Sequence, residues 1–118
     1  MKFTSHDIKI FNRLFESTPG YILDFSDRTM REFFEEELCI NIEDEAYLDD
    51  GPSKAKRLRC FIKKTDRDTV LKVVTRLWEY RKTMPGGVIN AQDEAAYGGF
   101  IAKIQGQTVK PRTASLPR

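Results

Sequence analysis

Apolar side chains recur every three or four positions in four segments, residues 5–15, 29–38, 53–64 and 65–82. This spacing places the apolar side chains of each segment on one face of a helix, where they can pack against a core. The pattern therefore predicts four helices. It is most regular in the last segment, where it predicts that Trp78 lies in the core, on the same helix face as Val70, Val73, Val74, Leu77 and Arg81.

Polar residues before the first two helices predict where these helices begin. Thr4 or Ser5 can cap the first helix, because a hydroxyl oxygen at that position accepts a hydrogen bond from a free backbone N–H group. Before the second helix Ser26 is one candidate, but Thr29 followed by Glu32 has the spacing of a capping box. We therefore expect the second helix to begin with Thr29 as its N-cap.

A short apolar run, Tyr21, Ile22, Leu23 and Phe25, separates these two helices. Its length fits either a brief strand or an extended segment that crosses the core. Because no partner strand is evident, we expect an extended segment from Tyr21 to Phe25.

A fifth helix is predicted for residues 92–105, with Asn90 as its cap. Its adjacent residues Gly98 and Gly99 each weaken a helix by about 1 kcal/mol relative to alanine. The pair therefore indicates either a kink or very close packing at this point.

The end of the chain differs in composition from the rest. Residues 106–118 are polar and contain two prolines and three basic residues but no acidic residue, which is typical of a linker. The sequence thus predicts one compact all-α domain of four or five helices over residues 1–105, followed by a flexible tail or linker over residues 106–118.

The charged residues are segregated along the chain. The formal net charge is only +2, but residues 35–50 carry eight acids and no base, and residues 54–67 carry seven bases and one acid. The basic segment fits a surface that contacts phosphates, a surface that pairs with acids of this domain or of a partner, or a solvated helix face. Its candidate contact residues are Lys54, Lys56, Arg57, Arg59, Lys63 and Lys64.

Residues suited to catalysis or metal binding are scarce. His6 is the only histidine, and Cys39 and Cys60 stand 21 positions apart, whereas zinc takes about four ligands at defined spacing. We therefore expect no catalytic residue, no metal and no cofactor, and a chain that is not itself an enzyme. The first residues lack the apolar region of a signal peptide, and no apolar stretch is long enough to span a bilayer, so we expect a cytoplasmic protein with no membrane contact.

Two stretches carry a resemblance to a known family: residues 20–29 (GYILDFSDRT), which continue through Phe33-Phe34, and residues 53–59 (SKAKRLR). They resemble a small N-terminal domain of bacterial multidomain proteins, some of abortive-infection type, in which an effector or sensor domain follows. The similarity covers residues 3–81. It implies a recognition or adaptor role in antiphage defence, without a catalytic signature.

The first of these stretches contains three candidate binding residues, Asp24, Asp27 and Arg28. Polar groups in a turn between two elements also commonly form caps and local ion pairs, so a purely structural role is the alternative for them. The function favoured by the sequence is a non-enzymatic recognition or adaptor domain that makes charge-complementary contacts with a protein partner or a fused effector domain. The alternative is a nucleic-acid-binding module that uses the basic helix of residues 54–67.

Overall fold

The computed structural model describes residues 1–16 and 19–106. Within these residues the secondary structure is helical, without a strand. This confirms the predicted all-α class, and of the four or five helices predicted the described residues form five. The elements are α1 (Ser5–Phe15), α2 (Asp27–Leu38), the single 3₁₀ turn η1 (Glu45–Tyr47), α3 (Lys54–Lys64), α4 (Arg67–Thr83) and α5 (Ala91–Gly106).

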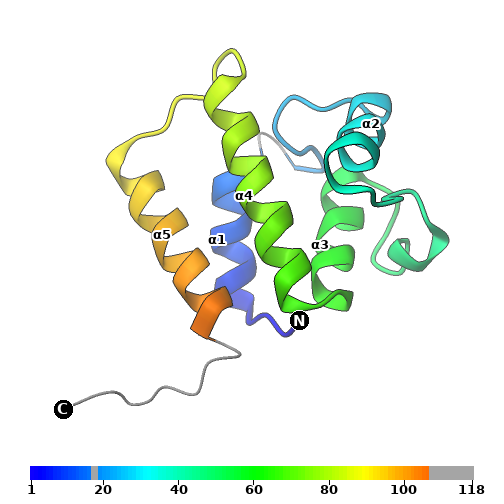
Figure 1. Ribbon diagram of the computed structural model, residues 1–118, viewed down its shortest axis with the longest axis horizontal. Coiled ribbons are helices and arrows are strands. Elements are labelled where there is room, and N and C mark those ends of the chain that lie inside the picture. Colours follow the sequence, from blue (N-terminus) through cyan, green and yellow to red (C-terminus); the bar gives the residue numbers. More distant parts are fainter. Residues whose placement is uncertain (17–18, 107–118) are drawn as a thin grey trace.

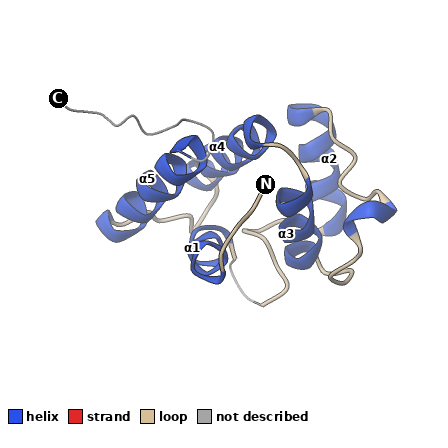
Figure 2. Cartoon of the chain, turned by 90° about the horizontal axis from the view of Figure 1, so that it is seen from below, coloured by secondary structure: helices blue, strands red, loops and turns tan. Residues whose placement is uncertain are grey.

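The longest helix, α4, lies at the centre of the domain (Figure 1). It contacts α1 and α5 on one side and α2 on the other. The view from below shows the same division, with α1, α4 and α5 grouped together and α2 beside α3 (Figure 2). Because α4 borders both groups, its buried stripe holds the domain together.

The core is one continuous cluster of apolar side chains. Trp78 is almost fully buried, as predicted, and its indole stacks on the ring of Tyr97 from α5 with the ring centroids 4.1 Å apart. All five helices contribute large side chains to the same cluster, among them Phe11, Phe15, Phe34, Leu58, Phe61, Leu77 and Phe100.

The helix starts follow the predicted caps, with one correction. Thr4 caps α1 through a hydrogen bond that its Oγ1 accepts from the N–H of Asp7. The expectation that Thr29 caps the second helix is wrong, because Ser26 is the N-cap. Ser26 and Thr29 each accept a hydrogen bond from the other's backbone N–H, at 3.0 and 2.8 Å. Thr29 thus holds the third position of the capping box, and the helix gains almost a full turn.

The apolar segment before α2 crosses the core without forming a strand, but it bends at one residue. Ile22, Leu23 and Phe25 are buried, whereas Tyr21 is exposed. Leu23 has a φ of 49°, the left-handed conformation, and its N–H donates to the carbonyl of Phe15 at 2.7 Å. This bend keeps Leu23 and Phe25 in the core and turns the chain toward the start of α2.

The last helix is continuous through its two glycines. Asn90 lies before α5 as predicted, and its Oδ1 accepts a hydrogen bond from the N–H of Asp93 at 2.7 Å. A Cβ atom added at Gly98 or Gly99 would meet no described atom within 4 Å, which excludes close packing as the reason for the pair. The helix extends to Gly106, and the rest of the predicted tail, residues 107–118, lies outside the described residues.

Candidate functional site

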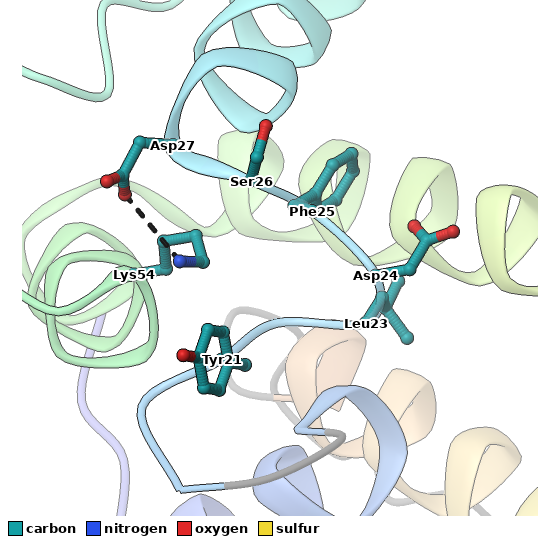
Figure 3. Close-up of a pocket in the computed structure, with 7 residues that line it drawn as sticks. All are labelled: Tyr21, Leu23, Asp24, Phe25, Ser26, Asp27 and Lys54. Atoms are coloured by element: carbon teal, nitrogen blue, oxygen red, sulfur yellow. Dashed lines mark ion pairs between the residues drawn. The ribbon is translucent and has the colours of Figure 1, made fainter.

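The main candidate site is a cleft of about 560 Å³ at the start of α2. Figure 3 shows the seven side chains that line it, six from residues 21–27 and the seventh from the first residue of α3. Its volume falls within the range of small-ligand and peptide-side-chain pockets. The cleft is lined by Tyr21, Leu23, Asp24, Phe25, Ser26, Asp27 and Lys54.

An aromatic cluster fixes the inner wall of this cleft. The ring of Phe25 stacks on that of Tyr80 from α4 at a centroid distance of 4.5 Å and also contacts Phe33 from α2. The hydroxyl of Tyr80 donates a hydrogen bond to the Asp24 carboxylate. Burial, together with this hydrogen bond, raises the pKa of Tyr80 to about 12, so the hydroxyl keeps its proton at neutral pH. The wall is therefore held by α2 and α4.

The outer part of the cleft combines an aromatic ring with opposite charges. Lys54 Nζ lies 4.5 Å from the centroid of the Tyr21 ring and 3.7 Å from Asp27 Oδ1. The Lys54 side chain is only 11% exposed, whereas that of Asp27 is 73% exposed. In Figure 3 Lys54 and Asp27 lie at one end and Asp24 at the other. An approaching group therefore meets the two carboxylates and the Tyr21 ring before it meets the ammonium.

A second hollow of about 390 Å³ adjoins the first. Tyr21, Asp27 and Lys54 line both of them. The remaining wall of the second hollow consists of Pro19, Gly20, Pro52 and Ser53. The side chains of Tyr21, Asp27 and Lys54 thus separate two parts of one longer groove.

Four of the six predicted contact residues of the basic helix form ion pairs within the chain. Lys54 pairs with Asp27 and Arg59 with Glu16. The other two, Lys63 and Lys64, pair with Asp50 at 2.8 Å and with Asp49 at 2.6 Å. The structure thus brings part of the acidic segment 35–50 against the basic segment 54–67, which is one of the interpretations left open by the sequence.

These ion pairs at the outer end of α3 also affect protonation. The hydrogen bond from Lys63 and the charges of nearby bases lower the pKa of Asp50, and the hydrogen bond to Asp49 raises the pKa of Lys64. Both shifts favour the charged forms, so the pairs persist around neutral pH.

The other two basic residues are not in ion pairs with described residues. Lys56 is exposed, and Arg57 donates from Nη2 to the carbonyl of Pro52 at 3.1 Å. Arg28, the third candidate of the first stretch, pairs with Glu32 one turn along α2 and does not line the cleft. Asp24 and Asp27 therefore join Lys54 at one site, whereas Arg28 faces elsewhere.

A buried ionic cluster between α1, α4 and α5 was not predicted. The Asp93 carboxylate accepts hydrogen bonds from Arg81 Nη2 at 2.9 Å and from Arg13 Nε at 3.1 Å. A second buried acid, Asp7, pairs with Lys103 at 3.0 Å. Both sets of ion pairs connect α1 with α5, and Asp93 also connects α5 with α4. These contacts explain how α5 is held against the domain, not how a ligand is bound.

The described residues contain no group of three or more histidine, cysteine, aspartate or glutamate side chains placed to hold a metal ion. Cys39 is exposed and Cys60 is buried, and each is a free thiol. Across residues 1–16 and 19–106, no helix combines the length and the apolar character needed to cross a membrane.

Comparison of the chain with models of known protein families, with curated proteins and with solved structures found no match.

Proposed function

We propose that this chain is a non-enzymatic recognition or adaptor domain that makes charge-complementary contacts with a protein partner. The observation that carries the proposal is the cleft at residues 21–27, where an exposed tyrosine and two carboxylates stand on a wall fixed by aromatic packing. Aromatic side chains, tyrosine among them, are enriched at protein interfaces, whose rims are polar.

The composition of the cleft supports recognition rather than catalysis. Its lining contains neither histidine nor cysteine, and its one aliphatic hydroxyl, Ser26 Oγ, accepts the capping hydrogen bond from Thr29. A nucleophilic mechanism needs a hydroxyl or thiol that is hydrogen-bonded to a general base, whereas the Ser26 hydroxyl is engaged with Thr29. We therefore assign no catalytic residue and no cofactor to this chain, and place any effector chemistry on a fused domain or a partner.

The biological setting that we propose is bacterial antiphage defence of the abortive-infection type, in the cytoplasm. Residues 20–29 and 53–59 carry the resemblance to the N-terminal domains of such proteins. The same two stretches supply the lining of the cleft and of the hollow beside it, apart from Pro19 and Pro52. Their convergence on one surface supports a shared binding role.

The alternative function, nucleic-acid binding through the basic helix, is favoured by fewer observations. Phosphate binding needs cations that are available for it. Lys63 and Lys64 already have carboxylate partners, and only Lys56 and Arg57 of the predicted set are not in ion pairs with described residues. We therefore rank protein recognition above nucleic-acid binding.

An electrophoretic shift assay over a range of salt concentrations separates these two functions. The chain and a variant with Lys56→Glu, Lys63→Glu and Lys64→Glu are tested with duplex and single-stranded oligonucleotides. We expect no difference between the two proteins at physiological salt. Binding that falls steeply with salt and disappears in the variant would instead establish the nucleic-acid module. Thermal melting is the control for folding, and the Tm of the variant should be at most slightly lower than that of the natural chain.

A further inference from the structure

We propose that the cleft at the start of α2 binds the cationic side chain, an arginine or a lysine, of a basic segment in a protein partner. This inference rests on the recognition function proposed above and specifies the chemistry of the partner. It is argued from the charge of the cleft, its exposed ring and the present position of Lys54.

The charge of the cleft favours a cation. Two carboxylates, Asp24 and Asp27, line it together with a single ammonium group. The Asp27 side chain is open to solvent, whereas the Lys54 side chain is mostly covered, with its ammonium near Asp27 and the Tyr21 ring. Complementary charge steers a partner and selects it against partners of the wrong sign. A basic side chain meets attraction here, and an acidic one meets repulsion.

The exposed ring of Tyr21 provides the second contact. This residue is 52% exposed, so part of its ring is open to a partner. Its ring already accepts the Lys54 ammonium at 4.5 Å, within the range of a cation–π contact. A guanidinium group stacks on such a ring and forms bidentate hydrogen bonds with a carboxylate, so arginine fits Tyr21 and Asp27 together.

Lys54 occupies the position that the incoming cation would take. Its separation of 3.7 Å from Asp27 is longer than the 2.7–2.9 Å of a strong charged hydrogen bond, so this contact is weak. Lys54 also lines both hollows of the groove. Displacement of its flexible stem would connect them and give room to a peptide on either side of the bound side chain. Lys54 is thus an internal competitor of the partner's cation.

This role of Lys54 distinguishes a cation site from an anion site. If the cleft bound a carboxylate or a phosphate, Lys54 would be its main attraction, and Lys54→Met would abolish binding. In a cation site the same substitution removes the competing charge and keeps a flexible apolar side chain that a peptide can displace. It should then strengthen binding.

The test is an NMR titration of the ¹⁵N-labelled chain with two short glycine–serine peptides. One carries a central arginine, and the other carries citrulline, which has the same shape without the charge. We expect the arginine peptide to shift amide signals of residues 20–27 and 53–55, and the citrulline peptide to bind at least several-fold more weakly. Asp27→Asn should reduce the affinity by up to about 5-fold, the range for an exposed ion pair. Lys54→Met should increase it.

A matched control is Asp68→Asn, which removes an exposed carboxylate from α4 that does not line the cleft. It should leave the affinity unchanged. Equal binding of the two peptides, the absence of binding at millimolar concentration, or weaker binding of Lys54→Met would each overturn the inference. If these results exclude a cation site, the recognition function still stands when a separate experiment finds a protein partner in contact with Tyr21. Failure of the cation site and failure of the recognition function are therefore distinguishable.

Discussion

Asp93 holds the start of α5 against two other helices, so its replacement by asparagine should lower the free energy of unfolding. Its side chain is 11% exposed, and its carboxylate binds Arg81 from α4 and Arg13 from α1. Asp93→Asn keeps the shape but removes the negative charge, so both guanidinium groups lose their counter-ion. Loss of one partner from a buried ion pair destabilises a protein by about 3–5 kcal/mol. We expect about 3 kcal/mol, the lower end, because Arg13 is 48% exposed and water can solvate it.

Urea denaturation at pH 7 measures this change directly, and a lower Tm, by about 12 °C, should accompany it. Arg81→Met should destabilise more than Arg13→Met, because Arg81 is the more buried partner and also donates to the carbonyls of Leu14 and Val88. A free energy of unfolding for Asp93→Asn within about 0.5 kcal/mol of the natural chain, the usual range for surface substitutions, would refute this reasoning.

The same cluster predicts a pH dependence. Burial disfavours the charged form of Asp93, but the hydrogen bond and charge of Arg81 and the hydrogen bonds with Arg13 and Asn90 outweigh it, so its pKa in the folded chain lies below the ordinary value of 3.8. A lowered pKa stabilises the fold above the unfolded value of about 3.9 and loses this contribution as the pH falls further. The stability difference between the natural chain and Asp93→Asn should therefore be constant above pH 5 and shrink below pH 4. A difference that widens in acid would contradict the assignment.

Four further variants have expected outcomes in thermal melting and urea denaturation. Trp78→Ala should destabilise by about 3–5 kcal/mol, because it empties the centre of the core, and near-natural stability would show that the indole is dispensable. Gly98→Ala should stabilise by up to about 1 kcal/mol, since the new methyl group meets open space on a helix, whereas Gly87→Ala should destabilise, since its Cβ would lie 2.0 Å from a backbone carbonyl oxygen. The reverse order of these two glycine variants would contradict the packing. Reversal of Lys63 and Lys64 to Glu should lower Tm only slightly, because their ion pairs are exposed, and a large loss would show that these pairs are structural.

The helices could be predicted from local pattern because their caps and apolar faces are local properties. Residues 5–15 became α1 with the predicted bounds, and the stripe around Trp78 became the buried face of α4. The start of α2 was misplaced because both Ser26 and Thr29 have capping chemistry. The structure decides between them, because the N–H of Thr29 donates to Ser26 Oγ and the N–H of Met30 donates to the Ser26 carbonyl, as in a helix that begins after Ser26.

The cleft could be predicted only in part, because it is assembled from segments distant in sequence. Asp24 and Asp27 were selected from one stretch and Lys54 from another, but nothing in the sequence indicated that they share a surface. The roles of Phe25 and Tyr80 were also missed, since their stacking joins residues 55 positions apart. The exposure of Tyr21 could not be predicted either, because in the sequence Tyr21 is simply one member of an apolar run. The other members of that run are buried.

Site-specific photocrosslinking tests the central claim, recognition of a protein partner through the cleft, most directly. A photoreactive phenylalanine analogue replaces Tyr21 in one version of the full chain and Lys63, on the exposed part of α3, in another. After irradiation in the native cells, we expect one discrete protein adduct from position 21, lost with Asp27→Lys, and none from position 63. Adducts from position 63 alone, adducts to nucleic acid, or an adduct at position 21 that Asp27→Lys leaves unchanged would contradict the account.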